Sequence, residues 1–288
     1  MKKILFTGGT GFLGRNLIPL LEAEYEVYSP TRNELNLKDA KSIDEYFEDK
    51  YFDVVIHAAI PNVAFCEDDS ANTLLLDSLY AFEKLAGKYM SYGKMIYFGS
   101  GAEYDKSADI AMVKESDIGK RIPHNDYGLA KYIMNDICRK SNKIYNLRIF
   151  GCYGPTDADF KLITSVIKQC AEGKDIILNQ NCYFDFMYVT DIVNILRHFI
   201  ENNPKYHDYN MCTGVRTEIK SIAEIIKKKM DAKGEIIVSE AGMNKEYTAD
   251  NSRLCEEIPG IKFTDLVDGI DKMIDFEMER IKNEKTSC

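Results

Sequence analysis

The sequence predicts an α/β fold built on a parallel sheet, and three observations support this prediction. Short apolar runs alternate with segments of helical spacing through the first half of the 288 residues. The apolar runs are nearly continuous, which is typical of strands that are covered on both faces. A glycine-rich loop joins the first apolar run to the first helical segment. Strand–helix alternation of this kind implies right-handed crossovers between parallel strands.

The elements of the first half follow in order. Each helical segment carries apolar residues three or four positions apart, and each predicted strand is a short apolar run. The strands are expected at residues 3–7, 26–30, 53–59, 94–98 and 145–150, and the helices at 12–23, 39–49, 72–91 and 126–140.

The pattern changes after about residue 155, and no linker or internal repeat separates the two parts. Thr190 and Asp191 form a good capping pair for one of the later helices. The later strands are expected at 175–179, 183–189, 208–214 and 235–240, and the later helices at 160–172, from 190 onwards, at 218–231 and at about 264–284.

Composition and charge exclude several classes of protein. The net charge of −9 argues against a duplex-binding role, which needs a concentrated basic face. No apolar run approaches the ~20 residues of a membrane span, and the N-terminal apolar run is too short for a signal peptide. The eight cysteines show no metal-ligand spacing and the four histidines are scattered. We therefore expect a cytoplasmic protein with reduced thiols, no metal and no partnership with nucleic acid or membrane.

The glycine loop "FTGGTGFLGRN" has the spacing of a dinucleotide-binding site. Gly9, Gly11 and Gly14 fit the G-x-G-x-x-G pattern, and Gly8 adds the wider spacing of three residues. Glycines there permit a tight turn and a close approach to a pyrophosphate, which the start of the helix then binds. A purely structural glycine turn is the alternative. The strand before the loop and the helix after it favour a Rossmann-type cofactor site, which would include Phe12, Leu13, Ala58 and Ala59.

The end of the second predicted strand bears on the choice of cofactor. A carboxylate at this position would bind the ribose 2′-hydroxyl and favour NAD. The sequence reads "YSPTRNELNL", so Arg32 stands where it could pair with a 2′-phosphate. Glu34 could still bind a ribose. We expect NADP, with NAD possible.

The stretch "PHNDYGLAKYI" places Tyr127 four residues before Lys131 in a predicted helix. Positions four apart lie on one face of a helix, so the phenol and the ammonium can point at the same place. A solvated lysine beside a half-buried tyrosine would give the same spacing. The rest of the chain decides between these interpretations.

Six motifs resemble those of the extended short-chain dehydrogenases/reductases, the NAD(P)-dependent sugar epimerase/dehydratase group. They occur in the order of that family and cover nearly the whole chain. The stretch "TRNELNLKDAKSIDEYF" is particularly similar to GDP-fucose synthases, which are NADP(H)-dependent sugar reductases. The motifs are "TGGTGFLG", "DVVIHAA", "FGSGAEY", "YGLAK", "LRIFGCYGP" and "FMYVTDIV".

The resemblance implies a fold and a catalytic set. A doubly wound parallel sheet would hold the cofactor, and a smaller α/β C-terminal lobe would close over a nucleotide sugar. The cofactor domain would comprise 1–155 plus about 180–212, and the substrate lobe about 156–179 plus 213–288. Tyr127 would be the acid/base, and Lys131 would lower the phenol's pKa and reach the cofactor ribose. Ser100 would hydrogen-bond the reacting oxygen.

The departures from the family pattern narrow the reaction. Family dehydratases follow the serine with an Asp–Glu pair, but here Gly101 and Ala102 follow Ser100. Those side chains cannot act as acid and base, so dehydration is not expected. GDP-fucose synthases use a cysteine and a histidine to epimerise sugar carbons. The position of the cysteine is occupied by Ala102 in this chain, and the position of the histidine falls near Ser165. The sequence therefore shows no catalytic residues for the epimerisation half of that reaction either.

The substrate pattern is altered as well. The usual Arg–Asp–Phe reads Phe184–Asp185–Phe186. Glu103 stands where an apolar residue is common and would either touch substrate or be solvated. Asp191 is assigned to helix capping. The expected substrate residues are Ser100, Gly101, Glu103, Arg216 and Arg253, with Lys161 and Lys168 as further basic residues that could meet a diphosphate.

The sequence thus predicts an NADP-dependent reductase of a nucleotide-linked keto-sugar, most plausibly at C4. A C4 epimerase with a retained NAD would use the same three residues. A non-catalytic NAD(P)-binding regulatory protein is the third alternative, which the intact Ser–Tyr–Lys set disfavours. A homodimer is expected through the helices at 72–91 and 126–140, as in the family.

Overall fold

A computed structural model describes residues 1–61 and 73–286 of the chain. Its centre is a six-stranded parallel sheet with the strand order β11-β6-β4-β3-β1-β2. The order reverses next to β1, as in doubly wound sheets, so the α/β prediction is confirmed. The strands are β1 (Lys3–Thr7), β2 (Glu26–Tyr28), β3 (Phe52–His57), β4 (Tyr92–Ser100), β6 (Ile144–Ile149) and β11 (Asp208–Met211).

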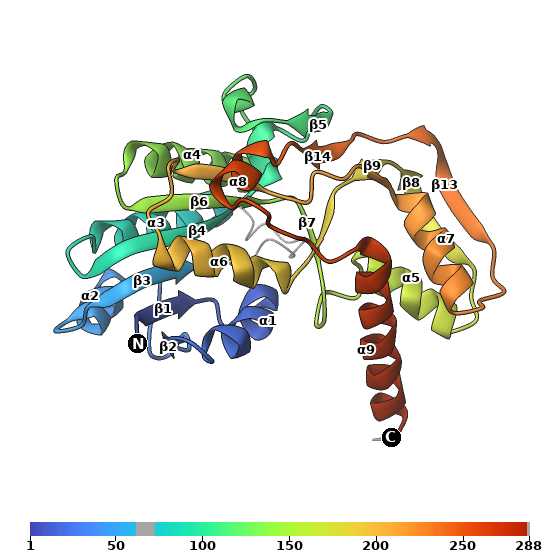
Figure 1. Cartoon of the computed structure of the whole chain (residues 1–288), viewed down its shortest axis with the longest axis horizontal. Coiled ribbons are helices and arrows are strands. Elements are labelled where there is room, and N and C mark those ends of the chain that lie inside the picture. Colours follow the sequence, from blue (N-terminus) through green and yellow to red (C-terminus); the bar gives the residue numbers. More distant parts are fainter. Residues whose placement is uncertain (62–72, 287–288) are drawn as a thin grey trace.

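Helices cover both faces of this sheet (Figure 1). One face packs against α1 (Phe12–Leu21) and α6 (Asp191–Glu201), with Leu17 and Leu196 fully buried. The other face packs against α2 (Ala40–Phe47), α3 (Leu74–Gly87) and α4 (Asp126–Lys140). Both faces are therefore apolar, which explains why the strands read as continuous apolar runs.

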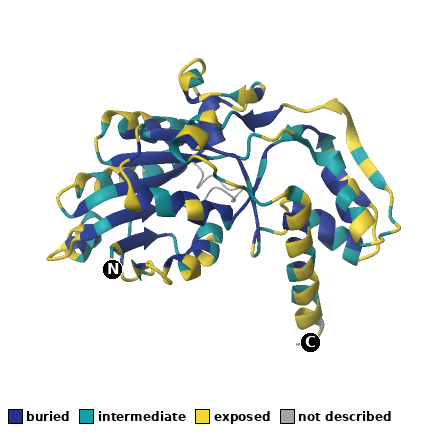
Figure 2. Ribbon diagram, viewed as in Figure 1, coloured by how far each residue is buried: buried dark blue, intermediate teal, exposed yellow. Residues whose placement is uncertain are grey.

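A smaller lobe lies beside the sheet and has its own core (Figure 1). Its strands β8 and β13 pair in parallel, and its three helices pack together through apolar side chains such as Ile167, Ile226 and Ile270. The elements are α5 (Leu162–Ala171), β8 (Ile176–Asn181), α7 (Ile219–Lys229), β13 (Ile236–Met243) and α9 (Leu266–Thr286). Figure 2 shows how exposed β13 and much of α9 are, in contrast to the central strands.

Short elements join the two parts. β7 pairs in parallel with β10, and β14 lies between β5 and β9 in a second small sheet. None of the turn or strand segments at 101–104, 110–113, 151–153 and 247–249 was predicted from the sequence. Their bounds are η3 (Gly101–Tyr104), β5 (Ile110–Val113), η4 (Glu115–Asp117), β7 (Gly151–Tyr153), β9 (Tyr183–Phe184), β10 (Phe186–Tyr188), β12 (Thr217–Glu218), β14 (Tyr247–Ala249) and α8 (Ser252–Glu257).

The structure differs from the sequence-based expectation at the start of α6 and in the placement of α8. Thr190 and Asp191 do not cap α6 through a side chain. Asp191 instead accepts hydrogen bonds from the backbone N–H and hydroxyl of Thr264, at 2.8 and 2.7 Å, and so ties the segment before α9 to the start of α6. Leu254 of α8 packs into the core beneath the sheet, although the predicted domain division assigned it to the lobe. That division stays a prediction.

Some expectations concern residues outside the described part. Two of the eight cysteines, Cys66 and Cys288, lie there, as does the first residue of the expected helix at 72–91. The six other cysteines are all free thiols. Within the described residues, no helix combines the length and the apolar character that a membrane crossing requires.

Candidate active site

A large cavity opens at the carboxyl ends of the central strands. The last residues of β1, β3, β4 and β6 all line it, namely Thr7, His57, Ser100 and Ile149. In doubly wound folds, ligands bind at this edge, where the strand order reverses. The cavity volume of about 1280 Å³ exceeds the ~300–1,000 Å³ of ordinary ligand sites, so it has room for two ligands.

The glycine loop forms one wall of this cavity. Gly8 has a φ of +82°, and a Cβ there would lie 2.7 Å from the backbone nitrogen of Ala59. Gly14 faces away from the cavity and packs directly on Gly9, where a Cβ would collide. The expected residues Gly8, Gly11, Phe12, Leu13, Ala58 and Ala59 all line the cavity.

The start of α1 suits an anionic ligand. Gly11 occupies the N-cap position, so no side chain caps the first N–H groups, and the first turn carries no acidic residue. Uncapped N–H groups and the helix dipole favour a phosphate at this point. The loop therefore has the geometry that the pyrophosphate of a dinucleotide requires, and its role as the cofactor site stays a prediction.

Arg32 lies at the far end of the same cavity. Ser29, Thr31 and Lys38 line the wall beside it. The alternative ribose ligand Glu34 is occupied, because its Oε2 accepts hydrogen bonds from the Thr31 backbone N–H at 2.7 Å and hydroxyl at 2.8 Å. These hydrogen bonds also lower the pKa of Glu34. This end of the cavity thus presents a guanidinium where an NAD site would present a carboxylate.

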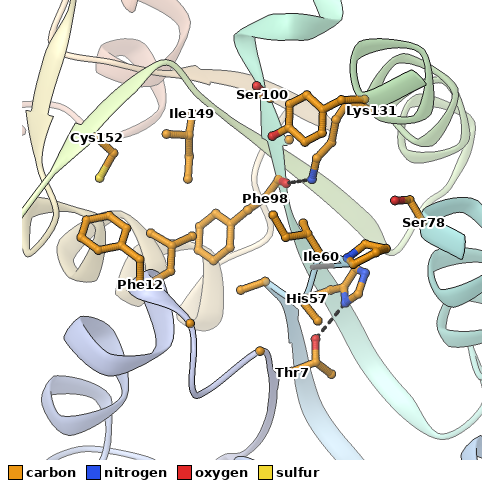
Figure 3. Close-up of a pocket in the computed structure, with 18 of the residues that line it drawn as sticks. Thr7, Phe12, His57, Ile60, Ser78, Phe98, Ser100, Lys131, Ile149 and Cys152 are labelled. Carbon is orange, nitrogen blue, oxygen red and sulfur yellow. Dashed lines mark hydrogen bonds between the residues drawn. The ribbon is translucent and has the colours of Figure 1, made fainter. Parts of the chain in front are cut away.

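Tyr127, Lys131 and Ser100 meet near the middle of the cavity. Asn125 caps α4 by accepting a hydrogen bond from the Gly128 N–H at 2.7 Å, which fixes the helix turn that carries Tyr127. The Lys131 ammonium donates to the carbonyl oxygen of Phe98 at 2.9 Å (Figure 3). It also lies 5.7 Å from the centre of the Tyr127 ring. The structure therefore brings the three sequence-predicted residues together.

Burial is the largest influence on the pKa values of Lys131 and Tyr127. It lowers the pKa of Lys131 to about 8, against the opposing effect of Glu103. It raises the pKa of Tyr127, while the hydrogen bond with Ser100 lowers it. The expected lowering of the Tyr127 pKa by Lys131 is absent from this arrangement, because the ammonium is turned towards the Phe98 carbonyl.

A buried ion pair supports the loop that carries Ser100. Glu103 is fully buried, and its Oε1 accepts the Ser100 backbone N–H at 3.0 Å. Its Oε2 accepts the Nε–H of Arg148 at 2.7 Å, and Arg148 is fully buried as well. Asn146 donates to both carboxylate oxygens at 3.1 Å. Glu103 is therefore neither solvated nor a lining residue, so its assignment to substrate binding is withdrawn.

The other predicted substrate residues also have different roles. Arg216 forms a two-pronged ion pair with Glu246, with distances of 2.8 and 2.6 Å, and its guanidinium lies 3.6 Å from the centre of the Tyr183 ring. Arg253 donates to the carboxylate of Asp208 at 2.9 Å. Neither arginine lines the cavity, and neither does Gly101. Contacts with residues far away in the sequence place these side chains outside the cavity, and the sequence alone does not reveal such contacts.

The cavity wall contains several residues that sequence reasoning missed. Tyr247, Lys106 and Asp157 line it, as does Lys161, which was named only as a possible diphosphate ligand. Lys168, named with it, instead pairs with Asp159 on the surface. Tyr247 opens the stretch "YTADNSRL" at 247–254, up to which the family resemblance extends, so that stretch was the available signal.

Comparison with known proteins agrees with this geometry. Residues 4–212 match the model of the NAD dependent epimerase/dehydratase family. A GDP-6-deoxy-D-mannose reductase of Pseudomonas aeruginosa is 25% identical over 271 residues, covering 85% of each chain. A putative UDP-glucose 4-epimerase of Methanocaldococcus jannaschii is 26% identical over 274 residues, covering 85% of this chain and 88% of the relative.

Solved structures share the fold at lower identity. A GDP-L-fucose synthetase of Naegleria fowleri bound to NADP has a TM-score of 0.85 at 18% identity, covering 98% of this chain and 94% of that one. The enzyme RMD of Pseudomonas aeruginosa with NADPH has a TM-score of 0.81 at 20% identity, covering 97% of this chain and 100% of that one. With its glycine loop, its Ser–Tyr–Lys group and a family match over residues 4–212, this chain belongs to the NAD dependent epimerase/dehydratase family of NAD(P)-dependent nucleotide-sugar enzymes.

Proposed function

We propose that this protein is an NADP-dependent reductase of a nucleotide-linked keto-sugar, with C4 as the reacting carbon. One observation carries the proposal. Ser100, Tyr127 and Lys131 share a cavity with the glycine loop, while Gly101 and Ala102 provide no acid or base for dehydration. This set can handle one proton at one carbonyl oxygen, which is what a reduction requires.

Bound NADPH would supply the hydride that the keto carbon receives. The glycine loop and the start of α1 would hold its pyrophosphate, and Arg32 would pair with the 2′-phosphate that distinguishes NADP from NAD. The engagement of Glu34 by Thr31 supports NADP, because it leaves no free carboxylate beside Arg32 among the described residues lining this end.

The chain's own residues would move the proton. Tyr127 donates its phenolic proton to the keto oxygen as negative charge develops there. Ser100 donates a hydrogen bond to the same oxygen and stabilises that charge. Lys131 would favour the tyrosinate left after transfer once its ammonium turns from the Phe98 carbonyl towards the phenol.

Relatives support a nucleotide sugar as substrate but differ in the nucleotide. GDP-linked sugars appear in the names of GDP-6-deoxy-D-mannose reductase and GDP-L-colitose synthase, and a CDP-linked sugar appears in that of CDP-abequose synthase. The test should therefore supply GDP-, UDP- and CDP-linked 4-keto-6-deoxyhexoses. We also propose a homodimer through α3 and α4.

The decisive experiment measures cofactor stoichiometry. A reductase should consume one NADPH for each keto-sugar reduced, because oxidised cofactor must leave after every turnover. An epimerase would interconvert C4 epimers with a retained NAD and no net consumption. Interconversion of UDP-glucose and UDP-galactose without added cofactor would refute the reductase and establish the epimerase. Tyr127→Phe serves as the inactive control in both assays.

A further inference from the structure

A second phenol lies beside Ser100. Tyr247 of β14 lines the cavity, and its hydroxyl oxygen is 3.5 Å from the Oγ of Ser100. Its ring packs between Phe150 and Phe184, with ring centroids at 5.2 and 4.8 Å. The Lys106 ammonium lies 4.4 Å from the ring centre. The phenol is thus held in place from three sides.

The residues that follow Ser100 make room for this phenol. A Cβ at Gly101 would lie 2.6 Å from the Tyr247 hydroxyl oxygen, so even alanine would displace it. Ala102 has a side chain too small to reach the same space. Where related dehydratases carry an acidic pair, this chain therefore places a tyrosine hydroxyl that comes from a strand 147 positions further along the sequence.

A count of donors and acceptors gives the direction of the contact. A serine hydroxyl has one proton to donate and two lone pairs that accept. The Ala102 N–H donates to one lone pair of Ser100 Oγ at 3.2 Å. A phenol is a stronger acid than an alcohol and is the better donor of the pair. The Ala102 N–H also reaches the Tyr247 hydroxyl, which accepts it, so the phenolic proton is left for the second lone pair of Ser100.

With both lone pairs filled, the serine proton must point elsewhere. Ser100 also interacts with Tyr127, and this interaction lowers the pKa of the Tyr127 phenol. We propose that Tyr247 is a positioning residue that fixes the Ser100 hydroxyl so that its proton points at the reacting oxygen beside Tyr127. This inference rests on the proposed function of Ser100. The 3.5 Å separation suits a contact that tightens when ligand fills the cavity.

The charged and titratable groups around Tyr127 come from several elements. Lys131 is on the same helix, Glu103 follows β4 in η3, and Tyr97 lies within β4. Removing the Tyr247 hydroxyl leaves all three in place. Tyr247 is itself coupled to Tyr127, so a change in the Tyr127 titration that disappears in a Ser100→Ala background would report on the Ser100 hydroxyl.

The first test needs no substrate. Tyr247→Phe keeps the ring and its packing, and frees the Ser100 hydroxyl to rotate. The pKa of Tyr127, followed by NMR of labelled tyrosine Cζ with Tyr127→Phe for assignment, should rise by about half to one pH unit. An unchanged Tyr127 pKa would overturn the proposal, whether the enzyme is a reductase or an epimerase.

The second test is a double-mutant cycle on turnover of the keto-sugar. Tyr247→Phe should lower kcat roughly tenfold with the serine present, and should have almost no further effect in a Ser100→Ala background. An equal loss in both backgrounds would mean that Tyr247 acts on the substrate directly, which would also overturn the proposal. A parent protein inactive on every keto-sugar would refute the proposed function, and the titration would still decide the role of Tyr247.

Tyr92→Phe is the matched control. It removes a buried hydroxyl that makes one hydrogen bond, to the Ala86 carbonyl at 3.0 Å, far from the cavity lining. It should lower the melting temperature about as much as Tyr247→Phe does. It should leave both kcat and the Tyr127 pKa unchanged.

Discussion

The buried ion pair under the site gives the sharpest prediction of stability. Glu103→Leu would replace this buried carboxylate with an apolar side chain. It removes the acceptor of the Ser100 N–H and the carboxylate 2.7 Å from Arg148 Nε. The guanidinium stays buried, with Asp208 at 3.2 Å as its remaining carboxylate partner among the described residues. Removing one member of a buried pair costs about 3–5 kcal/mol of unfolding free energy.

The size of this effect depends on burial and not on the number of contacts. Both side chains of the pair are 0% exposed, whereas Asp136 and Lys140 on α4 form an ion pair in which the side chains are 55% and 74% exposed. Asp136→Ala should therefore leave stability nearly unchanged, since solvent screens such pairs. The combination Glu103→Leu with Arg148→Leu should cost much less than the sum of the single changes, because no unpaired charge remains.

Urea unfolding followed by far-UV circular dichroism measures these values. Tryptophan fluorescence cannot be used, because the chain contains 18 tyrosines and 0 tryptophans. A loss below about 1 kcal/mol for Glu103→Leu would refute the reasoning, since that is the range of exposed pairs. So would simple additivity in the double variant.

Three further predictions concern the cavity. Arg32→Ala should reduce the preference for NADPH over NADH by tenfold or more in a binding titration, and equal affinities in the parent protein would exclude the proposed role. Tyr127→Phe should lower turnover by roughly 10²–10⁴ with unchanged cofactor affinity, whereas Lys131→Met should weaken cofactor binding as well; identical effects on binding would contradict the division of roles. Burial raises the pKa of Asp157 from 3.8 to about 6, so the folded protein binds the proton more tightly and this residue's contribution to stability falls as the pH rises from about 4 to 6. Asp157→Asn should remove that part of the pH dependence in thermal unfolding of the ligand-free protein, and an unaltered pH profile would show that Asp157 titrates normally.

Local patterns in the sequence predicted the parts of the fold and site that depend on neighbours along the chain. The central strands and helices follow from apolar runs and helical spacing. The Tyr127–Lys131 pair follows from the helix period, and the glycine loop from its own spacing. Each of these features lies within a short segment, so the sequence alone contains the information.

The misassigned residues depend on distant partners instead. Arg253 and Arg216 seemed available for a diphosphate, but Asp208 and Glu246 neutralise them. Those carboxylates lie 45 and 30 positions away in the sequence, and the short strands that bring such segments together carry too few residues to show a period. Tyr247 was missed for the same reason, since β14 is only three residues long.

The segment from Ser100 to Tyr104 shows why site and core cannot be treated separately here. Ser100 faces the cavity through its hydroxyl, while its backbone N–H binds Glu103 in the core. Tyr104 extends the same buried network, because its hydroxyl donates to Asn210 at 2.8 Å. This chain holds Ser100 by a charged hydrogen bond from its backbone N–H to the buried carboxylate of Glu103, which restricts the loop to one conformation. In that conformation the space beside Gly101 stays open for the hydroxyl of Tyr247.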